Sequence, residues 1–242
     1  MHSFYIEPPV DGVARLPAGE AKHAAKVLRL KPGDEVCALD GAGGRWRGEI
    51  EAVSDGDVRL RLIEGLDSHE SPLRLTVYEG IPKADKLDFI AQKLTELGAA
   101  ALTPVRMERC VVKLDDRDGE KRRERLEKIA REAAKQCGRG RFPRVERPLD
   151  WPRALEEMKR HELLLIPWEE AGGRGLKEAF AAAPGARNIG IVIGPEGGMS
   201  PGEVAAMAEI GGVTVTLGPR ILRTETAAVV SAALAMQLWG DI

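Results

Sequence analysis

The sequence has little cysteine and no pattern of metal ligands. Its three cysteines, Cys37, Cys110 and Cys137, are far apart, odd in number and form no Cys-x-x-Cys pair. This argues against a disulfide framework and a zinc site and favours a reducing cytoplasm. The four histidines also lack metal-ligand spacing (His2, His23, His69 and His161). We therefore expect a protein that binds no metal.

Long apolar runs are missing as well. Every apolar stretch is interrupted well before the roughly 20 residues that a membrane span requires. The N-terminal residues lack a basic start followed by an apolar segment, so we expect no signal peptide and a cytoplasmic protein. With 242 residues, 43% hydrophobic and 31% charged, the composition is that of one large or two modest globular domains.

The net charge of −2 gives no sign of a polyanionic partner, but its distribution does. Residues 121–147 contain eleven lysines and arginines against four glutamates, an excess of +7, so the rest of the chain sums to −9. A basic segment on an otherwise acidic chain is typical of a surface that binds nucleic acid. The alternative is a solvated helix face of mixed charge.

Two regions of the sequence differ in the secondary structure that they predict. Residues 1–70 contain short β-like segments separated by turn signals, which predicts a small β-rich barrel. One helix interrupts it, over residues 19–30, with Lys22, Lys26 and Arg29 at i, i+4 and i+7 on one face. These three residues are candidate RNA contacts, or else a solvated face.

From Leu73 onward, strands and helices alternate. Buried-type strands are predicted over 73–80, 100–105, 162–168, 189–194 and 213–218. Helices are predicted over 84–98, 121–137, 200–210 and 225–239, the third with a capping box formed by Ser200 and Glu203. The last is apolar nearly all round, so it is buried in the core or in a subunit interface. The alternation predicts a parallel sheet with helices on both faces.

Three loops follow predicted strands in the last third of the chain: IPWEE (166–170), IGPEGGMS (193–200) and LGPRILRTETA (217–227). Ligands of open parallel sheets bind at the carboxyl ends of strands, so these loops are the predicted site. The glycines of the second loop suit either a phosphate cradle or a tight turn. No dinucleotide or P-loop signature supports a nucleotide cofactor of those kinds.

The motifs together resemble a known family. Its features match, in chain order, HAAKVLRLKPGDEV (23–36), IPKADKLDFIAQKLTELG (81–98), ERCVVK (108–113), AAKQCGR (133–139), GPEGG (194–198) and LGPRILRTETA (217–227). This set resembles the RsmE family of SPOUT RNA methyltransferases, which methylates N3 of a uridine in small-subunit (16S) ribosomal RNA. The start, MHSFYI, departs from the family's basic-Phe-Phe opening, which weakens any inference about RNA contacts there.

The resemblance implies a PUA-like β-barrel RNA-binding domain over 1–70 and a SPOUT methyltransferase domain over 71–242, whose last third forms a trefoil knot. It implies a homodimer through the last helix and a site for S-adenosylmethionine built from the three loops. The implied cofactor-binding residues are Leu165, Pro167, Trp168, Ile193, Gly194, Pro195, Glu196, Gly197, Leu217, Gly218, Arg220, Ile221, Leu222 and Thr226.

Catalysis at the N3 atom of uridine requires loss of a proton, because this imide is mostly protonated at neutral pH. Arg223 could stabilise the anion, since an opposite charge lowers a pKa. Glu225 could take the proton, or could instead favour the first turn of the last helix. Arg223 could also bind a phosphate or pair with Glu225 or Glu196. Trp168 could contact the cofactor or belong to the core.

Lys83 and Arg139 are implied RNA contacts, in addition to the three basic residues of the first domain. Two other functions stay open. The first is a SPOUT methyltransferase that acts on another base, a ribose 2′-hydroxyl or a transfer RNA. The second is a non-catalytic RNA-binding assembly factor that has kept the fold.

Overall fold

The computed structural model describes residues 1–54, 56–172 and 174–242. Their contacts divide the chain into two compact units. The first unit consists of Met1–Glu70 and Arg131–Phe142, and the second of Ser71–Ala130 and Pro143–Ile242. A segment beyond position 130 thus belongs with the N-terminal residues. The change in predicted secondary structure near residue 70 could not indicate this.

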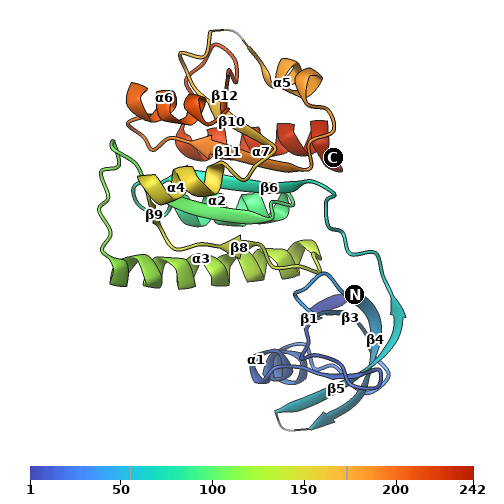
Figure 1. Ribbon diagram of the computed structural model, residues 1–242. Coiled ribbons are helices and arrows are strands. Elements are labelled where there is room, and N and C mark those ends of the chain that lie inside the picture. Colours follow the sequence, from blue (N-terminus) through green and yellow to red (C-terminus); the bar gives the residue numbers. More distant parts are fainter. Residues whose placement is uncertain (55, 173) are drawn as a thin grey trace. The chain divides into compact units, whose positions relative to one another are not determined.

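The first unit is a curved five-stranded sheet (Figure 1) with the order β1-β3-β4-β5-β2. The strands are β1 (His2–Tyr5), β2 (Val13–Arg15), β3 (Glu35–Leu39), β4 (Arg45–Ser54) and β5 (Asp57–Gly65). β1 pairs with β3 in parallel, and the other pairs are antiparallel. Its core is aliphatic apart from Phe4. β2 was not predicted, because three residues carry too short a pattern.

The predicted helix over 19–30 is interrupted. Helix α1 (Ala18–Lys22) passes into a π-helical turn, η1 (His23–Val27). Arg29 lies beyond the turn with a φ of 54°, in the left-handed region. The three basic residues therefore do not share the α-helical face that their spacing predicted, because a π turn rotates the positions that follow it.

The second unit is a parallel sheet with the order β12-β10-β11-β6-β7-β8, and a short strand, β9, also pairs with β7. The strands are β6 (Arg74–Gly80), β7 (Ala101–Arg106), β8 (Arg144–Val145), β9 (Leu149–Asp150), β10 (Leu163–Pro167), β11 (Asn188–Ile193) and β12 (Val213–Val215). Five of these confirm the predicted strands, and the parallel pairing confirms the fold class. The trefoil knot stays a prediction.

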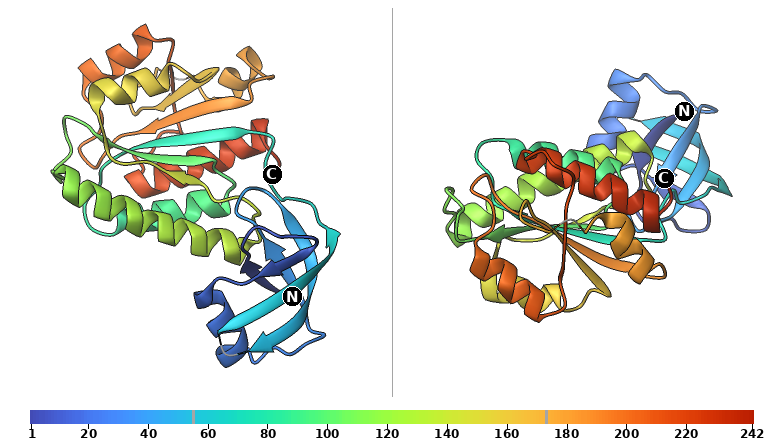
Figure 2. Two further views of the ribbon diagram at one scale, coloured as in Figure 1. Left: turned by 60° about the horizontal axis from the view of Figure 1, so that its bottom comes forward. Right: turned by 90° about the horizontal axis from the view of Figure 1, so that it is seen from above.

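Helices cover both faces of this sheet, as Figure 2 shows. One apolar cluster joins the sheet to α2 (Lys86–Glu96), α3 (Asp116–Cys137) and α7 (Thr224–Trp239). A second cluster on the other face includes α4 (Trp151–Met158) and α6 (Pro201–Glu209). Helix α5 (Leu176–Ala182) packs against the end of α7 through Phe180 and Trp239. Neither α4 nor α5 was among the predicted helices, since both are short.

Local signals explain several helix boundaries. Ser200 accepts a hydrogen bond from the Glu203 N–H, and the Glu203 carboxylate accepts one from the Ser200 N–H, which is the predicted capping box of α6. Asp85 occupies the N-cap position of α2, but its side chain makes no capping hydrogen bond. Gly98 ends that helix with a φ of 86°. Over the described ranges, no helix combines the length and apolar character that crossing a membrane demands.

Candidate functional site

The predicted loops meet at one edge of the second unit. β10 lies between β11 and β12, and all three run in parallel, with Pro167 opposite Val215 at the ends of β10 and β12. Their carboxyl ends therefore share an edge of the sheet. The chain leaves β10 at Trp168, β11 at Gly194 and β12 at Thr216, so residues up to 48 positions apart in the sequence are brought together.

Two adjoining cavities lie among these loops. The first has a volume of about 490 Å³ and is lined by Pro167, Trp168, Glu169, Thr216, Leu217, Gly218, Pro219, Arg220, Ile221, Leu222 and Ala227. The second has a volume of about 530 Å³ and is lined by Lys86, Pro167, Glu169, Ile193, Gly194, Pro195, Glu196, Gly197, Gly198, Met199, Ile221, Leu222, Arg223, Thr224 and Ala227. The two cavities adjoin, because both are lined by Pro167, Glu169, Ile221, Leu222 and Ala227.

The loop of residues 194–198, here called the glycine loop, packs too tightly for larger residues. A Cβ atom on Gly194 would lie 3.0 Å from backbone atoms of Gly198 and Met199. Gly198 has a φ of 70°, which L side chains rarely adopt. These constraints explain why glycine stands at both positions. The loop consequently presents bare backbone to the second cavity.

A lysine that we did not predict, Lys86, holds two of the loops. Its Nζ lies 2.9 Å from Glu196 Oε1 and 3.3 Å from Glu225 Oε2. Burial opposes the ionisation of Glu196, but hydrogen bonds from Lys86 and from backbone N–H groups, including that of Lys83, outweigh it and lower its pKa. The same bond to Glu196 raises the pKa of Lys86. The first residue of α2 thus connects the glycine loop to the first turn of α7.

A second unpredicted group lies beneath the site. Glu79, near the end of β6, is fully buried, and its Oε1 lies 2.6 Å from Thr224 Oγ1. The same Thr224 hydroxyl oxygen lies 2.8 Å from the carbonyl oxygen of Gly194. A glutamate in phase with Leu75 and Val77 on a buried strand is the signal in the sequence that could have identified this position.

Twelve of the fourteen residues expected to bind the cofactor line one or both cavities. The exceptions are Leu165, which is fully buried in the core of the sheet, and Thr226, which is exposed on α7. Trp168 packs against the core cluster on the α4 and α6 face and also lines the first cavity, so its contact with the cofactor stays a prediction.

The two candidate catalytic residues lie differently. Arg223 is the N-cap residue of α7, is exposed and lines the second cavity. Glu225 is on neither cavity wall and forms the ion pair with Lys86. It also lies in the first turn of α7, where a carboxylate suits the helix dipole. Within one chain, the geometry supports contact with a ligand for Arg223 and a structural role for Glu225.

Comparison with known proteins identifies the chain. The RNA methyltransferase domain family matches residues 69–236, and the RNA methyltransferase PUA domain family matches residues 16–63. The ribosomal RNA small subunit methyltransferase E of Bacillus subtilis is 38% identical over 94% of this chain and 93% of its own length. The chain belongs to the ribosomal RNA small subunit methyltransferase E family.

Further members support the assignment. The methyltransferase E of Mycobacterium bovis is 34% identical over 94% of this chain and 88% of its own length. The crystal structure of the Neisseria gonorrhoeae methyltransferase E bound to S-adenosyl methionine has a TM-score of 0.88 and 31% identity, and covers 100% of this chain and 99% of that one. Both units of the present structure thus correspond to a whole family member.

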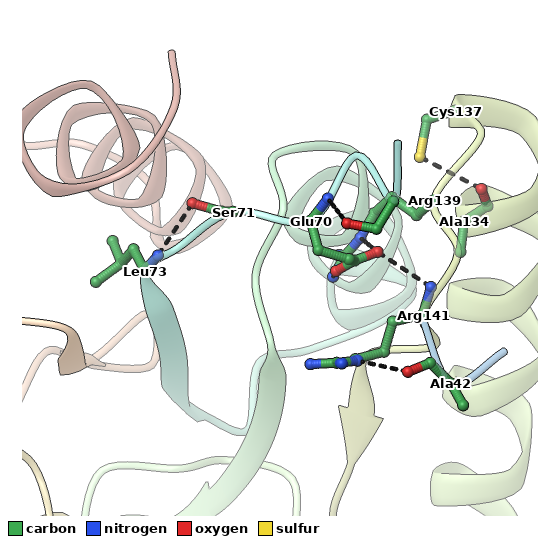
Figure 3. Close-up of polar contacts among 9 residues, drawn as sticks. Ala42, Glu70, Ser71, Leu73, Ala134, Cys137, Arg139 and Arg141 are labelled. Atoms are coloured by element: carbon green, nitrogen blue, oxygen red, sulfur yellow. Dashed lines mark hydrogen bonds and ion pairs between the residues drawn. The ribbon is translucent and has the colours of Figure 1, made fainter. Parts of the chain in front are cut away.

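The RNA contacts expected from the family resemblance divide into exposed and buried residues. Lys22, Lys26, Arg29 and Lys83 are exposed. Arg139 is 4% exposed, and its Nη2 donates a hydrogen bond to Glu70 Oε2 at 2.8 Å. The same carboxylate accepts the Arg141 backbone N–H at 3.0 Å, as Figure 3 shows. The guanidinium of Arg139 is therefore buried and paired inside the first unit. It is not exposed for the phosphate contact that was predicted.

Much of the basic segment is also paired with acidic residues. On α3, Arg123 bonds to Glu120 and Glu127, and Arg125 bonds to Asp88 of α2. The local excess of +7 in the sequence is thereby reduced on the folded surface, since Glu120 and Asp88, which lie outside residues 121–147, pair with these cations. No group of three or more potential metal ligands occurs among the described residues.

Proposed function

We propose that this protein transfers a methyl group from S-adenosylmethionine to N3 of a specific uridine in small-subunit (16S) ribosomal RNA. The observation that carries the proposal is the pair of adjoining cavities at the strand ends, with Arg223 on the wall of the second. A methyltransferase needs a place for the methyl donor next to a place for the acceptor base. Membership of the family and the fold of the S-adenosyl methionine-bound relative support the same assignment.

The residues present fit this cofactor. Both cavities have volumes within the range of roughly 300–1,000 Å³ that is usual for small-molecule sites. Leu217, Ile221 and Leu222 offer apolar walls to an adenine, and the glycine loop offers backbone groups at close range. The carboxylate of Glu169 lines both cavities and suits a cationic ligand. The cofactor supplies an electrophilic methyl group on a sulfonium centre.

The chain's own residues then prepare the acceptor. The N3 atom becomes nucleophilic only after it loses its proton, which leaves an anion delocalised toward O2 and O4. The exposed guanidinium of Arg223 is the cation placed on the second cavity to stabilise that anion. The ion pairs of Lys86 with Glu196 and Glu225 fix the glycine loop relative to the start of α7. The loops can then hold the base in line with the methyl group of the cofactor. A water or a carboxylate accepts the proton.

The RNA is proposed to be read mainly by its phosphates. The family match over 16–63 favours the first unit as an RNA-binding, PUA-like domain, with Lys22, Lys26 and Arg29 exposed on it. Phosphate contacts make such binding salt-sensitive. The target uridine must be unstacked to reach the site, as in a loop, a junction or a flipped base.

We further propose a cytoplasmic homodimer that forms through α7. Several apolar residues of this helix remain partly exposed in the single chain, including Val229, Val230, Leu234 and Leu238. A second copy of the helix would cover them. Sedimentation equilibrium tests this part, and a monomer at micromolar concentration would contradict it.

Transfer of labelled methyl groups from S-adenosylmethionine to purified small subunits that lack their modifications tests the reaction. Nucleoside analysis is expected to give a single 3-methyluridine peak. Another methylated nucleoside, or transfer only to a different RNA, would favour a related methyltransferase with another target. Absence of both transfer and cofactor binding would favour the non-catalytic assembly factor.

A further inference from the structure

Glu79 is a carboxylic acid in an apolar position. It follows Leu75 and Val77 along the same face of β6, and these two residues pack in the core cluster shared with α2 and α7. The Glu79 side chain has no exposed surface, and its Oε2 has no hydrogen-bond partner among the described residues. An ionised carboxylate in this place would be costly, because burial removes its hydration.

The two short contacts of the Thr224 hydroxyl favour a protonated Glu79. Thr224 Oγ1 lies within hydrogen-bond distance of both Glu79 Oε1 and the Gly194 carbonyl oxygen, at 2.6 and 2.8 Å. A hydroxyl has one proton to donate, and a carbonyl oxygen can only accept. Both contacts are satisfied when Thr224 donates to Gly194 and accepts a hydrogen bond from Glu79. Glu79 can donate only if it carries a proton.

The surrounding charges favour the same state. The nearby cation, Lys86, is bound to Glu196 of the glycine loop and Glu225 of α7. These two carboxylates disfavour a third negative charge beside them. Burial is the largest cause that raises the pKa of Glu79 well above its ordinary value, and the negative charges of Glu196 and Glu225 raise it further.

We propose that Glu79 is a neutral carboxylic acid and a positioning residue, which fastens the start of α7 to the glycine loop by donating a hydrogen bond to Thr224. Thr224 directly follows Arg223, and Gly194 begins the glycine loop. The hydrogen bond that Glu79 donates therefore fixes the positions of Arg223 and of the glycine loop on the wall of the second cavity. This role rests on the proposed methyltransferase function, because it is the cofactor and the base that need those places.

A stability difference follows from the proton. In the folded protein Glu79 keeps its proton above pH 4.5, which is the ordinary pKa of glutamate, whereas in the unfolded chain it releases the proton there. The folded state then binds more protons, so its stability falls as the pH rises from about 4.5 to the native pKa of Glu79. Glu79→Gln has no such proton, yet its amide N–H can donate to Thr224. Relative to this variant, the wild type loses up to about tenfold in its folding constant for each pH unit.

The test compares Glu79→Gln, Glu79→Ala and, as a matched control, Glu209→Gln, which alters an exposed glutamate on α6. Denaturant unfolding from pH 4.5 to 8 measures stability, and calorimetry with S-adenosylmethionine measures affinity. We expect Glu79→Gln to bind the cofactor within about twofold of the wild type and to gain stability over it as the pH rises. We expect Glu79→Ala to bind at least about tenfold more weakly and Glu209→Gln to match the wild type in both measurements.

Two results would overturn the inference. One is a Glu79→Gln variant that loses affinity as severely as Glu79→Ala, which would mean that the charge is required. The other is a stability difference between wild type and Glu79→Gln that does not change with pH. Failure of the proposed function would be seen in a different measurement. The wild type would then transfer no methyl group to small subunits, although the stability and cofactor affinity of the variants follow the expected pattern.

Discussion

Gly80→Ala is a single-methyl change whose effect can be estimated from the contacts at the site. Gly80 ends β6 directly beneath the glycine loop. A Cβ atom there would lie 2.5 Å from Pro195 Cδ, 2.7 Å from Pro195 N and 2.9 Å from Met107 Sδ. The φ of Gly80 lies outside the left-handed region, so the cost comes from contact alone. The proline ring and backbone cannot rotate away as a flexible side chain could.

The size of the effect follows from the distance that Pro195 must retreat. An ordinary contact begins near 3.4 Å, so the shift from 2.5 Å is about 0.9 Å. Forcing an additional methyl group into a packed core costs about 1–3 kcal/mol of stability. Because Pro195 belongs to the glycine loop, the shift also moves a wall of the second cavity, and a displacement near 1 Å can cost on the order of 10²-fold in rate.

Gly202→Ala is the matched control, because it is the same substitution in open space. Gly202 lies in the first turn of α6, and among the described residues a Cβ atom there would approach only Ser200, whose Oγ would lie 3.9 Å away. Alanine there should add about 0.5–1 kcal/mol of stability, since glycine loses more backbone entropy on folding. Denaturant unfolding and calorimetry with S-adenosylmethionine measure both variants. Gly80→Ala with wild-type stability and affinity would refute the packing argument.

Three further predictions concern charged groups. Lys86→Met removes the cation between Glu196 and Glu225, so we expect the free energy of unfolding to fall by about 1 kcal/mol for each ion pair. We also expect calorimetry to show weaker binding of S-adenosylmethionine. Arg223→Ala should lower kcat for methyl transfer by roughly 10²-fold with little change in stability, because the exposed guanidinium has no core contact to lose. His161 has a pKa lowered by burial, against the opposing hydrogen bond of Asn188, so it is neutral when folded and takes up a proton on unfolding. Stability should therefore fall as the pH drops below about 6.5, which unfolding curves measure.

Two of these predictions, those for Lys86 and His161, have a control in the chain. Lys93→Met removes a lysine from the same helix that pairs only with Glu96 among the described residues, so cofactor affinity should be unchanged. His2→Gln replaces an exposed histidine and should leave the acid stability as it is. An equal loss of affinity in Lys86→Met and Lys93→Met would contradict the bridging role of Lys86. Acid sensitivity that persists in His161→Gln would contradict the role of that histidine.

The sequence was sufficient for the features that depend on local pattern. Buried strands such as 189–194 are recognised by their apolar runs, and α6 begins where its capping box, Ser200 with Glu203, predicts. The rule that ligands bind at the carboxyl ends of parallel strands then placed the site on three loops, and all three line the cavities. Motif resemblance added the cofactor, which no periodicity could supply.

Only the tertiary structure decided which charges are available. The sequence shows Arg139 at the end of a basic run, but Glu70 is folded against it and buries it. Lys86 is an ordinary first-turn lysine in the sequence, and it becomes a bridge because Glu196 and Glu225 approach it from segments more than 100 residues away. Glu79 is neutral for the same reason: burial and neighbouring charges set its pKa, and both are made by residues distant in the chain.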